Sequence, residues 1–128
     1  MRRLLLFLFA IAATTSLLAQ SHDMPANMEA HMLVLLVKPP NAPDFPKEKL
    51  EELQAAHLAN IRRLAEEKKL LKAGPFEDYS GRNVRGMFIF ESADKTEVEQ
   101  LVASDPLVKA GRLAPEYLKW WTEKGSLK

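Results

Sequence analysis

The chain has 128 residues, no cysteine, and 18 Lys and Arg residues against 17 Asp and Glu residues. The absence of cysteine excludes disulfide bonds, a cysteine nucleophile and a lipid-modified cysteine anchor. The near balance of charge gives no reason to expect a nucleic acid or an acidic membrane as a partner.

Residues 1–19 have the layout of a secretory signal peptide. Two arginines precede an apolar run from Leu4 to Ala13, and small and polar residues lead to Ala19. The apolar run is short for a membrane span, so we expect cleavage after Ala19, export to the periplasm or outside the cell, and no stable membrane span afterwards. A retained signal anchor is the alternative. The remaining chain is long enough for one small domain with one core.

Residues 20–30, QSHDMPANMEA, have no apolar periodicity and are predicted to form a flexible N-terminal tail. The potential metal ligands in and beside this tail are His22, Asp23, Glu29 and His31. Their irregular spacing matches no metal-binding motif. We therefore expect no metal site and no other cofactor.

A strand and a long helix are predicted in the first half of the domain. The strand, HMLVLLV, is rich in Leu and Val and stops before Pro39. Pro46 suits the first position of a helix that runs to about Lys69. The charged residues of RRLAEEKK form the solvated face of this helix.

The second half of the domain begins with two strands. LLKAGPFED is a short strand, broken at Gly74 and Pro75, and VRGMFIFES is the next strand after a turn. Asp94 and Glu97 stand at capping-box spacing at the start of a second helix. That helix is predicted to end by Asp105, because the following proline disfavours helical dihedral angles in the residue before it.

PLVKAG is predicted to form one further helical turn, LAPEYLKWW the last strand, and residues 123–128 a C-terminal tail. The order is therefore βαββαβ. Two split βαβ units in this order give an α+β fold, the ferredoxin-like plait, with a four-stranded antiparallel sheet and both helices on one face.

The first strand predicts a homodimer, because both of its faces are apolar. Leu33 and Leu35 alternate with Val34 and Leu36, and side chains alternate between the two faces of a sheet. Two helices cover only one face. The economical partner for the other face is the same sheet from a second copy of the chain.

One polar residue lies on the apolar stripe of the first helix, LEELQAAHLANIRRLAEE. At 100° per residue, Leu50, Leu53, Ile61 and Leu64 all point within roughly 40° of His57. His57 is therefore expected to point inward. It is either a satisfied core histidine or an imidazole that the protein uses.

The predicted fold permits a contact between this histidine and Asp105. Both helices should lie on one sheet face and run in the same sense, which brings Asp105 to about the level of His57. A carboxylate bonded to one ring nitrogen leaves the other nitrogen free as a general acid or base. Asp105 followed by Pro106 is also a strong helix cap, so a purely structural role stays open.

Three other residues are candidates for substrate binding. Gly74 and Pro75 shape a strand end that could border a pocket, although a chain that must turn there is sufficient reason for both. Arg85 lies in a strand among apolar residues and could hold an anionic group, or it could simply be exposed at the strand edge. Serine nucleophile motifs and phosphate-binding glycine loops are absent from the sequence.

HLANIRRLAEEKKLLKAGPFED, RGMFIFES and ASDPLVKAGRL together resemble the YCII-related domain family, over roughly residues 31–122. The resemblance implies the ferredoxin-like plait, its pairing into a dimeric α/β barrel, and an active-site pair that matches His57 and Asp105. Related barrels include isomerases, dehydrochlorinases and monooxygenases acting on small ring compounds. Some related barrels also bind haem, but nothing else in this sequence supports haem handling through His57.

The sequence thus predicts an exported homodimer that performs lyase, isomerase or dehydrochlorinase chemistry on a small ring or carbonyl compound. His57 and Asp105 would carry out the general acid–base step. The alternative is a non-catalytic module that binds a small molecule or assists another envelope protein.

Overall fold

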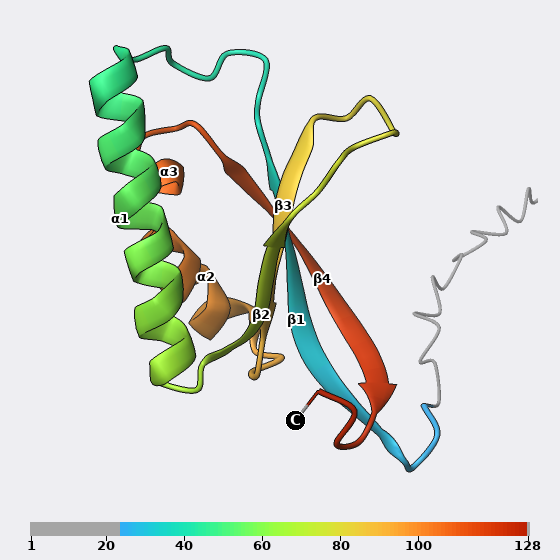
Figure 1. Ribbon diagram of the computed structural model, residues 1–128. Coiled ribbons are helices and arrows are strands. Elements are labelled where there is room, and N and C mark those ends of the chain that lie inside the picture. The colour runs from blue at the N-terminus through green and yellow to red at the C-terminus, as the bar shows by residue number, and fades with distance from the viewer. Residues whose placement is uncertain (1–23, 128) are drawn as a thin grey trace, which may run out of the picture.

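The structure is a computed structural model that describes residues 24–127, and the predicted signal peptide lies outside these residues. The elements follow in this order (Figure 1): β1 (Met28–Val37), α1 (Lys47–Glu66), β2 (Leu70–Pro75), β3 (Val84–Phe90), α2 (Lys95–Ala103), α3 (Pro106–Lys109) and β4 (Ala114–Glu123). The strands form an antiparallel sheet in the order β2-β3-β1-β4. This is the predicted α+β, ferredoxin-like plait, with α3 as the short additional turn.

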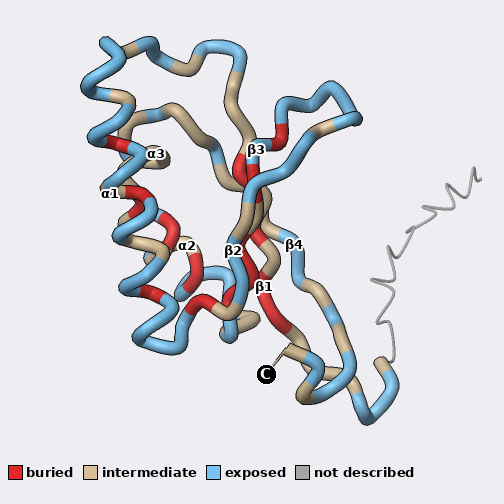
Figure 2. The backbone as a smooth tube through the Cα atoms, viewed as in Figure 1, coloured by how far each residue is buried: buried red, intermediate tan, exposed pale blue. Residues whose placement is uncertain are grey.

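The core lies between the sheet and the helices, which gather on one side of it (Figure 1). Val34 of β1 lies opposite Phe88 of β3, and Met32 lies opposite Phe90. These side chains pack with Leu64 of α1 and with residues of α2 in one buried cluster. Figure 2 shows the buried positions along the inner side of the helices and the central strands.

No helix of residues 24–127 covers the opposite face of the sheet (Figure 1). We call it the open face. Its apolar residues alternate with those of the core and include Leu33, Leu35, Met87, Ile89, Leu118 and Trp120. On the open face Leu118 is 51% exposed. Val34, whose side chain points to the helix side of the same sheet, is fully buried. The two-sided apolar pattern is therefore present in the sheet, and the dimer that it predicts stays a prediction.

The paired strands β1 and β4 extend further than their apolar pattern indicates. Met28 lies opposite Glu123, so residues 28–30 belong to the sheet and not to the predicted tail of residues 20–30. At the other end Glu123 closes β4 and is not part of a C-terminal tail. Backbone hydrogen bonds between the two strands continue past the core, and Lys124 N–H still donates to the Asn27 carbonyl at 2.8 Å.

Three predictions about where elements begin, end or break were wrong. Pro46 is the N-cap of α1 and not its first helical residue, and α1 ends at Glu66, short of Lys69, because Lys68 takes a left-handed conformation with φ of 58°. The strand β2 is not broken at Gly74 but runs to Pro75. A proline is tolerated there because β2 is an edge strand. No helix among residues 24–127 is both long and apolar enough to cross a membrane.

Candidate active site

A short hydrogen bond joins His57 of α1 to Asp105 at the start of α3. His57 Nδ1 lies 2.6 Å from Asp105 Oδ2. His57 is 9% exposed and Asp105 is fully buried. A carboxylate only accepts hydrogen bonds, so Nδ1 carries the proton and donates it. In the neutral ring the other nitrogen, Nε2, is then an acceptor.

The other oxygen of Asp105 caps α3. Oδ1 accepts from the backbone N–H of Leu107 at 2.9 Å and of Val108 at 3.3 Å, with Pro106 at the start of the helix. The structural role that the sequence indicated is therefore real, and the same carboxylate also binds the histidine. Because the cap fixes one oxygen, the other oxygen is held in place toward α1.

Phe88 supports the imidazole from the sheet side. The rings of His57 and Phe88 stack with centroids 6.0 Å apart and planes inclined by 28°, and Phe88 in turn meets Phe90 edge-on at 5.8 Å. Leu53 and Leu64 are buried on the same face of α1 as His57, as predicted. The histidine is thus oriented from two sides, by a carboxylate and by an aromatic ring.

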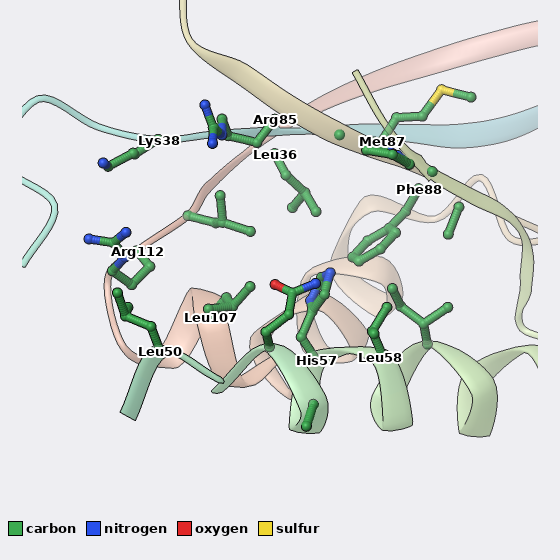
Figure 3. Close-up of a pocket in the computed structure, with 18 of the residues that line it drawn as sticks. Leu36, Lys38, Leu50, His57, Leu58, Arg85, Met87, Phe88, Leu107 and Arg112 are labelled. Carbon is green, nitrogen blue, oxygen red and sulfur yellow. The ribbon is translucent and has the colours of Figure 1, made fainter. Parts of the chain in front are cut away.

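A cavity of 920 Å³ lies between α1 and the sheet, and His57 lines it. Figure 3 shows the His57 side chain rising from α1 toward Phe88, with Leu36, Leu58 and Leu107 around the same space. His57 Nε2 has no hydrogen-bond partner within residues 24–127. It is accessible to solvent, unlike the buried, unpartnered side-chain nitrogens of His31 and Asn60. A cavity of this size and lining suits a small, mostly apolar ligand.

The structure brings the three predicted substrate-binding residues to the same cavity. Gly74, Pro75 and Arg85 all line it together with His57. Arg85 is exposed, and its Nη1 lies 3.4 Å from Asn83 Oδ1. A methyl group added to Gly74 would meet no atom within 4 Å, so nothing in the packing requires a glycine there. Whether these residues bind a substrate stays a prediction.

Three further lining residues were missed at the level of sequence. Lys38 and Arg112 border the cavity, and Gly86 forms part of its sheet wall. A Cβ on Gly86 would lie 2.7 Å from the backbone oxygen of Gly74. A glycine inside an apolar strand is a recognisable sign of close backbone approach. In contrast, nothing in the local sequence places Arg112 beside α1.

The turn between β2 and β3 carries strong electrostatic interactions outside the cavity. Hydrogen bonds from Ser80, and further from the Val84 backbone N–H, lower the pKa of Asp78 to about 2. The carboxylate of Glu116 on β4 raises the pKa of Arg82, which donates to it at 2.7 Å. These contacts fix the turn and tie it to β4.

Comparison with known proteins gives a family and a structural relative. The model of the YCII-related domain matches residues 25–122. No curated protein sequence matches the chain. Nine chains of solved structures are similar to it. One of these is 5-chloro-2-hydroxyhydroquinone dehydrochlorinase from Burkholderia phenoliruptrix AC1100 in complex with 2,5-dihydroxybenzoquinone, with 25% identity over 70% of this chain and 92% of that chain and a TM-score of 0.52. Since the family model covers most of its length, this chain belongs to the YCII-related domain family.

Proposed function

We propose that the chain catalyses a general acid–base reaction on a small ring or carbonyl compound, with His57 Nε2 as the group that takes or gives the proton. The observation that carries the proposal is that the His57 ring lines the cavity while its Nδ1 lies 2.6 Å from the buried carboxylate of Asp105. Such a bond fixes the tautomer and orients the ring, which is what a general base requires. Asp105 acts through His57 and is a positioning residue.

The reaction type proposed is an elimination of the dehydrochlorinase kind or a related proton shift. In the loss of HCl from a chlorohydroquinone, a proton first moves from a ring hydroxyl to the carbon that bears chlorine, which gives the keto tautomer. A base then removes the proton of a second hydroxyl, a new C=O double bond forms, and chloride leaves with the electron pair of its bond to carbon. One imidazole that takes and gives protons can serve both steps, and no oxidant or reductant is consumed. The dehydrochlorinase relative, whose structure holds a small quinone, supports this choice.

The proposal is tested by chloride release and product analysis with 5-chloro-2-hydroxyhydroquinone and related chlorinated hydroquinones. Wild-type protein should release chloride, and His57→Ala should abolish the release while leaving the far-ultraviolet circular dichroism unchanged. Full activity in His57→Ala would overturn the proposal. Saturable binding with every compound recovered unchanged would instead establish the non-catalytic binding module.

We also propose that the working form is a homodimer joined through the open face. The half-buried Leu33 and Leu35 and the exposed Leu118 support this, because apolar side chains on an uncovered sheet favour burial against a partner. Light scattering at micromolar concentration should give twice the mass of the chain, and Leu118→Lys should halve it. A wild-type monomer would contradict the proposal.

Export is proposed from residues 1–19 alone. The full chain expressed in a Gram-negative host should be recovered from the periplasm or the medium with Gln20 as its first residue. Recovery with Met1 in place would contradict cleavage.

A further inference from the structure

We propose that the substrate is a small ring compound with an anionic group, such as a carboxylate, held by the cationic side chains at one end of the cavity. This inference rests on the function proposed for His57 and deepens it by naming the class of substrate. It is carried by the placement of Lys38, Arg85 and Arg112 in the same cavity as the His57 ring.

The charge of the cavity lining is one-sided. Four cationic residues line it, Lys38, Lys47, Arg85 and Arg112, against Glu51 as the one acidic residue of the described lining. Glu51 Oε1 lies 3.6 Å from Lys47 Nζ on the same face of α1, so these two charges offset each other. Figure 3 shows Lys38, Arg85 and Arg112 together on one side of His57.

Two of these cations have no acidic partner in the part of the chain that the structure describes. Within residues 24–127 neither Lys38 nor Arg85 makes an ion pair, and Arg85 approaches only the amide oxygen of Asn83. The charges of Lys38 and Arg85 are therefore available to a ligand in the cavity. Basic side chains that converge on a partly enclosed space attract anions and concentrate them there.

Arg112 is held in place by hydrogen bonds to a neighbouring loop. Its side chain is 17% exposed, its Nη1 donates to the Pro43 carbonyl at 2.8 Å, and it lies 3.3 Å from Asp44 Oδ1. Asp44 is 99% exposed, so water competes strongly for that carboxylate. A guanidinium held in this way is suited to bind a planar carboxylate through its remaining N–H groups.

The charges at the two ends of the cavity would orient the ligand. The buried carboxylate of Asp105 stands behind His57 and disfavours an anionic group near the imidazole. The apolar side chains of Leu36 and Leu107 line the space as well and suit a ring. The anionic group would then face the cations while the reacting atom faces His57 Nε2.

The test compares two probes that differ only by a carboxylate, 2,5-dihydroxybenzoate and hydroquinone, by titration calorimetry on the wild-type protein at low salt. We expect the carboxylate to bind at least about tenfold tighter and the advantage to shrink as salt is added. Lys38→Met and Arg85→Met should each reduce the affinity advantage of 2,5-dihydroxybenzoate over hydroquinone several-fold. Arg62→Met, which removes an exposed cation of α1 outside the cavity lining, should leave it unchanged.

His57→Asn separates this inference from the proposed function. The variant should keep the preference for 2,5-dihydroxybenzoate, because His57 does not hold the anion, even where turnover is lost. Equal affinity for both probes, binding of neither, or a preference that survives loss of both Lys38 and Arg85 would overturn the inference. An intact preference together with turnover that is indifferent to His57 would support the inference and remove the proposed function.

Discussion

Two buried histidines, on opposite faces of the same sheet, differ in one respect that decides what each can do. His57 on the helix side is 9% exposed, and His31 in β1, on the open-face side by strand alternation, is 5% exposed. Both rings place Nδ1 against an oxygen, Asp105 Oδ2 for His57 and the Glu91 carbonyl at 3.0 Å for His31. Because a carbonyl also only accepts, both rings carry the proton on Nδ1.

The difference lies at the second nitrogen. Among the described residues, His31 Nε2 is sealed from solvent without a hydrogen bond and lies 3.4 Å from Glu29 Oε1, whereas His57 lines a cavity. A histidine among apolar residues is therefore not by itself a sign of a site. Access to the free nitrogen is what separates a structural imidazole from one that can exchange a proton with a ligand.

After His57→Ala, the largest predicted effect comes from Asp105→Asn. Asparagine is as good a helix cap as aspartate, so its oxygen should keep the backbone bonds of α3 and its NH₂ should face His57. An NH₂ group donates, which would force the proton of His57 onto Nε2 and remove the base. We expect turnover to fall by about 10²- to 10⁴-fold.

The control for this variant is its thermal midpoint, which should stay close to wild type because the cap is retained. Asp105→Ala, in contrast, removes the cap and should lower the thermal midpoint of unfolding. Wild-type turnover in Asp105→Asn would contradict the role of the His57 tautomer.

The next variant, His31→Ala, tests the other half of the comparison. Loss of this buried ring and its bond to the Glu91 carbonyl should cost about 1–3 kcal/mol of unfolding free energy, measured by urea denaturation. Turnover per folded protein should be unchanged. A loss of turnover as large as that of His57→Ala would show that the two histidines do not differ as argued.

A smaller effect is expected at the sheet wall of the cavity. Gly86→Ala places a methyl group 2.7 Å from the Gly74 oxygen, so β2 must shift, at a cost of about 1–3 kcal/mol and with weaker ligand binding. Gly74→Ala is the matched control, because its methyl group would meet open space. Equal stability of the two variants by thermal denaturation would contradict the close approach of β2 and β3.

The smallest effect concerns the turn outside both histidine sites. The pKa of Asp78 is lowered from 3.8 to about 2 in the folded chain, so its contribution is present above about pH 4 and is lost as pH falls toward 2. Asp78→Asn should therefore flatten the loss of stability between pH 4 and 2, slightly, in urea titrations at each pH. An unchanged acid slope would contradict the hydrogen bonding of this turn.

The fold was largely predictable because its information is local and periodic. Alternating apolar residues in β1, the cap at Asp94 and the proline after Asp105 each act through neighbours in the sequence, and each was found. Strand ends were harder: residues 28–30 join the sheet through hydrogen bonds to β4, which lies far along the chain.

The site was predictable only in part. The apolar stripe of α1 pointed to His57, and the cap at Asp105 together with the family resemblance supplied its partner. Arg112 reaches the cavity because its loop is fastened to Pro43, nearly seventy residues away, and Phe88 meets the imidazole across the core. Contacts of this kind depend on how separate elements pack, and no short sequence pattern records them.

The most direct test of the central claim is long-range ¹H–¹⁵N correlation NMR of the histidine rings, recorded with and without 2,5-dihydroxybenzoquinone. We expect a proton on Nδ1 in both His57 and His31, and a ligand-induced shift of Nε2 in His57 alone. A proton on His57 Nε2 in the free protein, or a ligand that leaves His57 unshifted while it perturbs His31, would contradict this expectation.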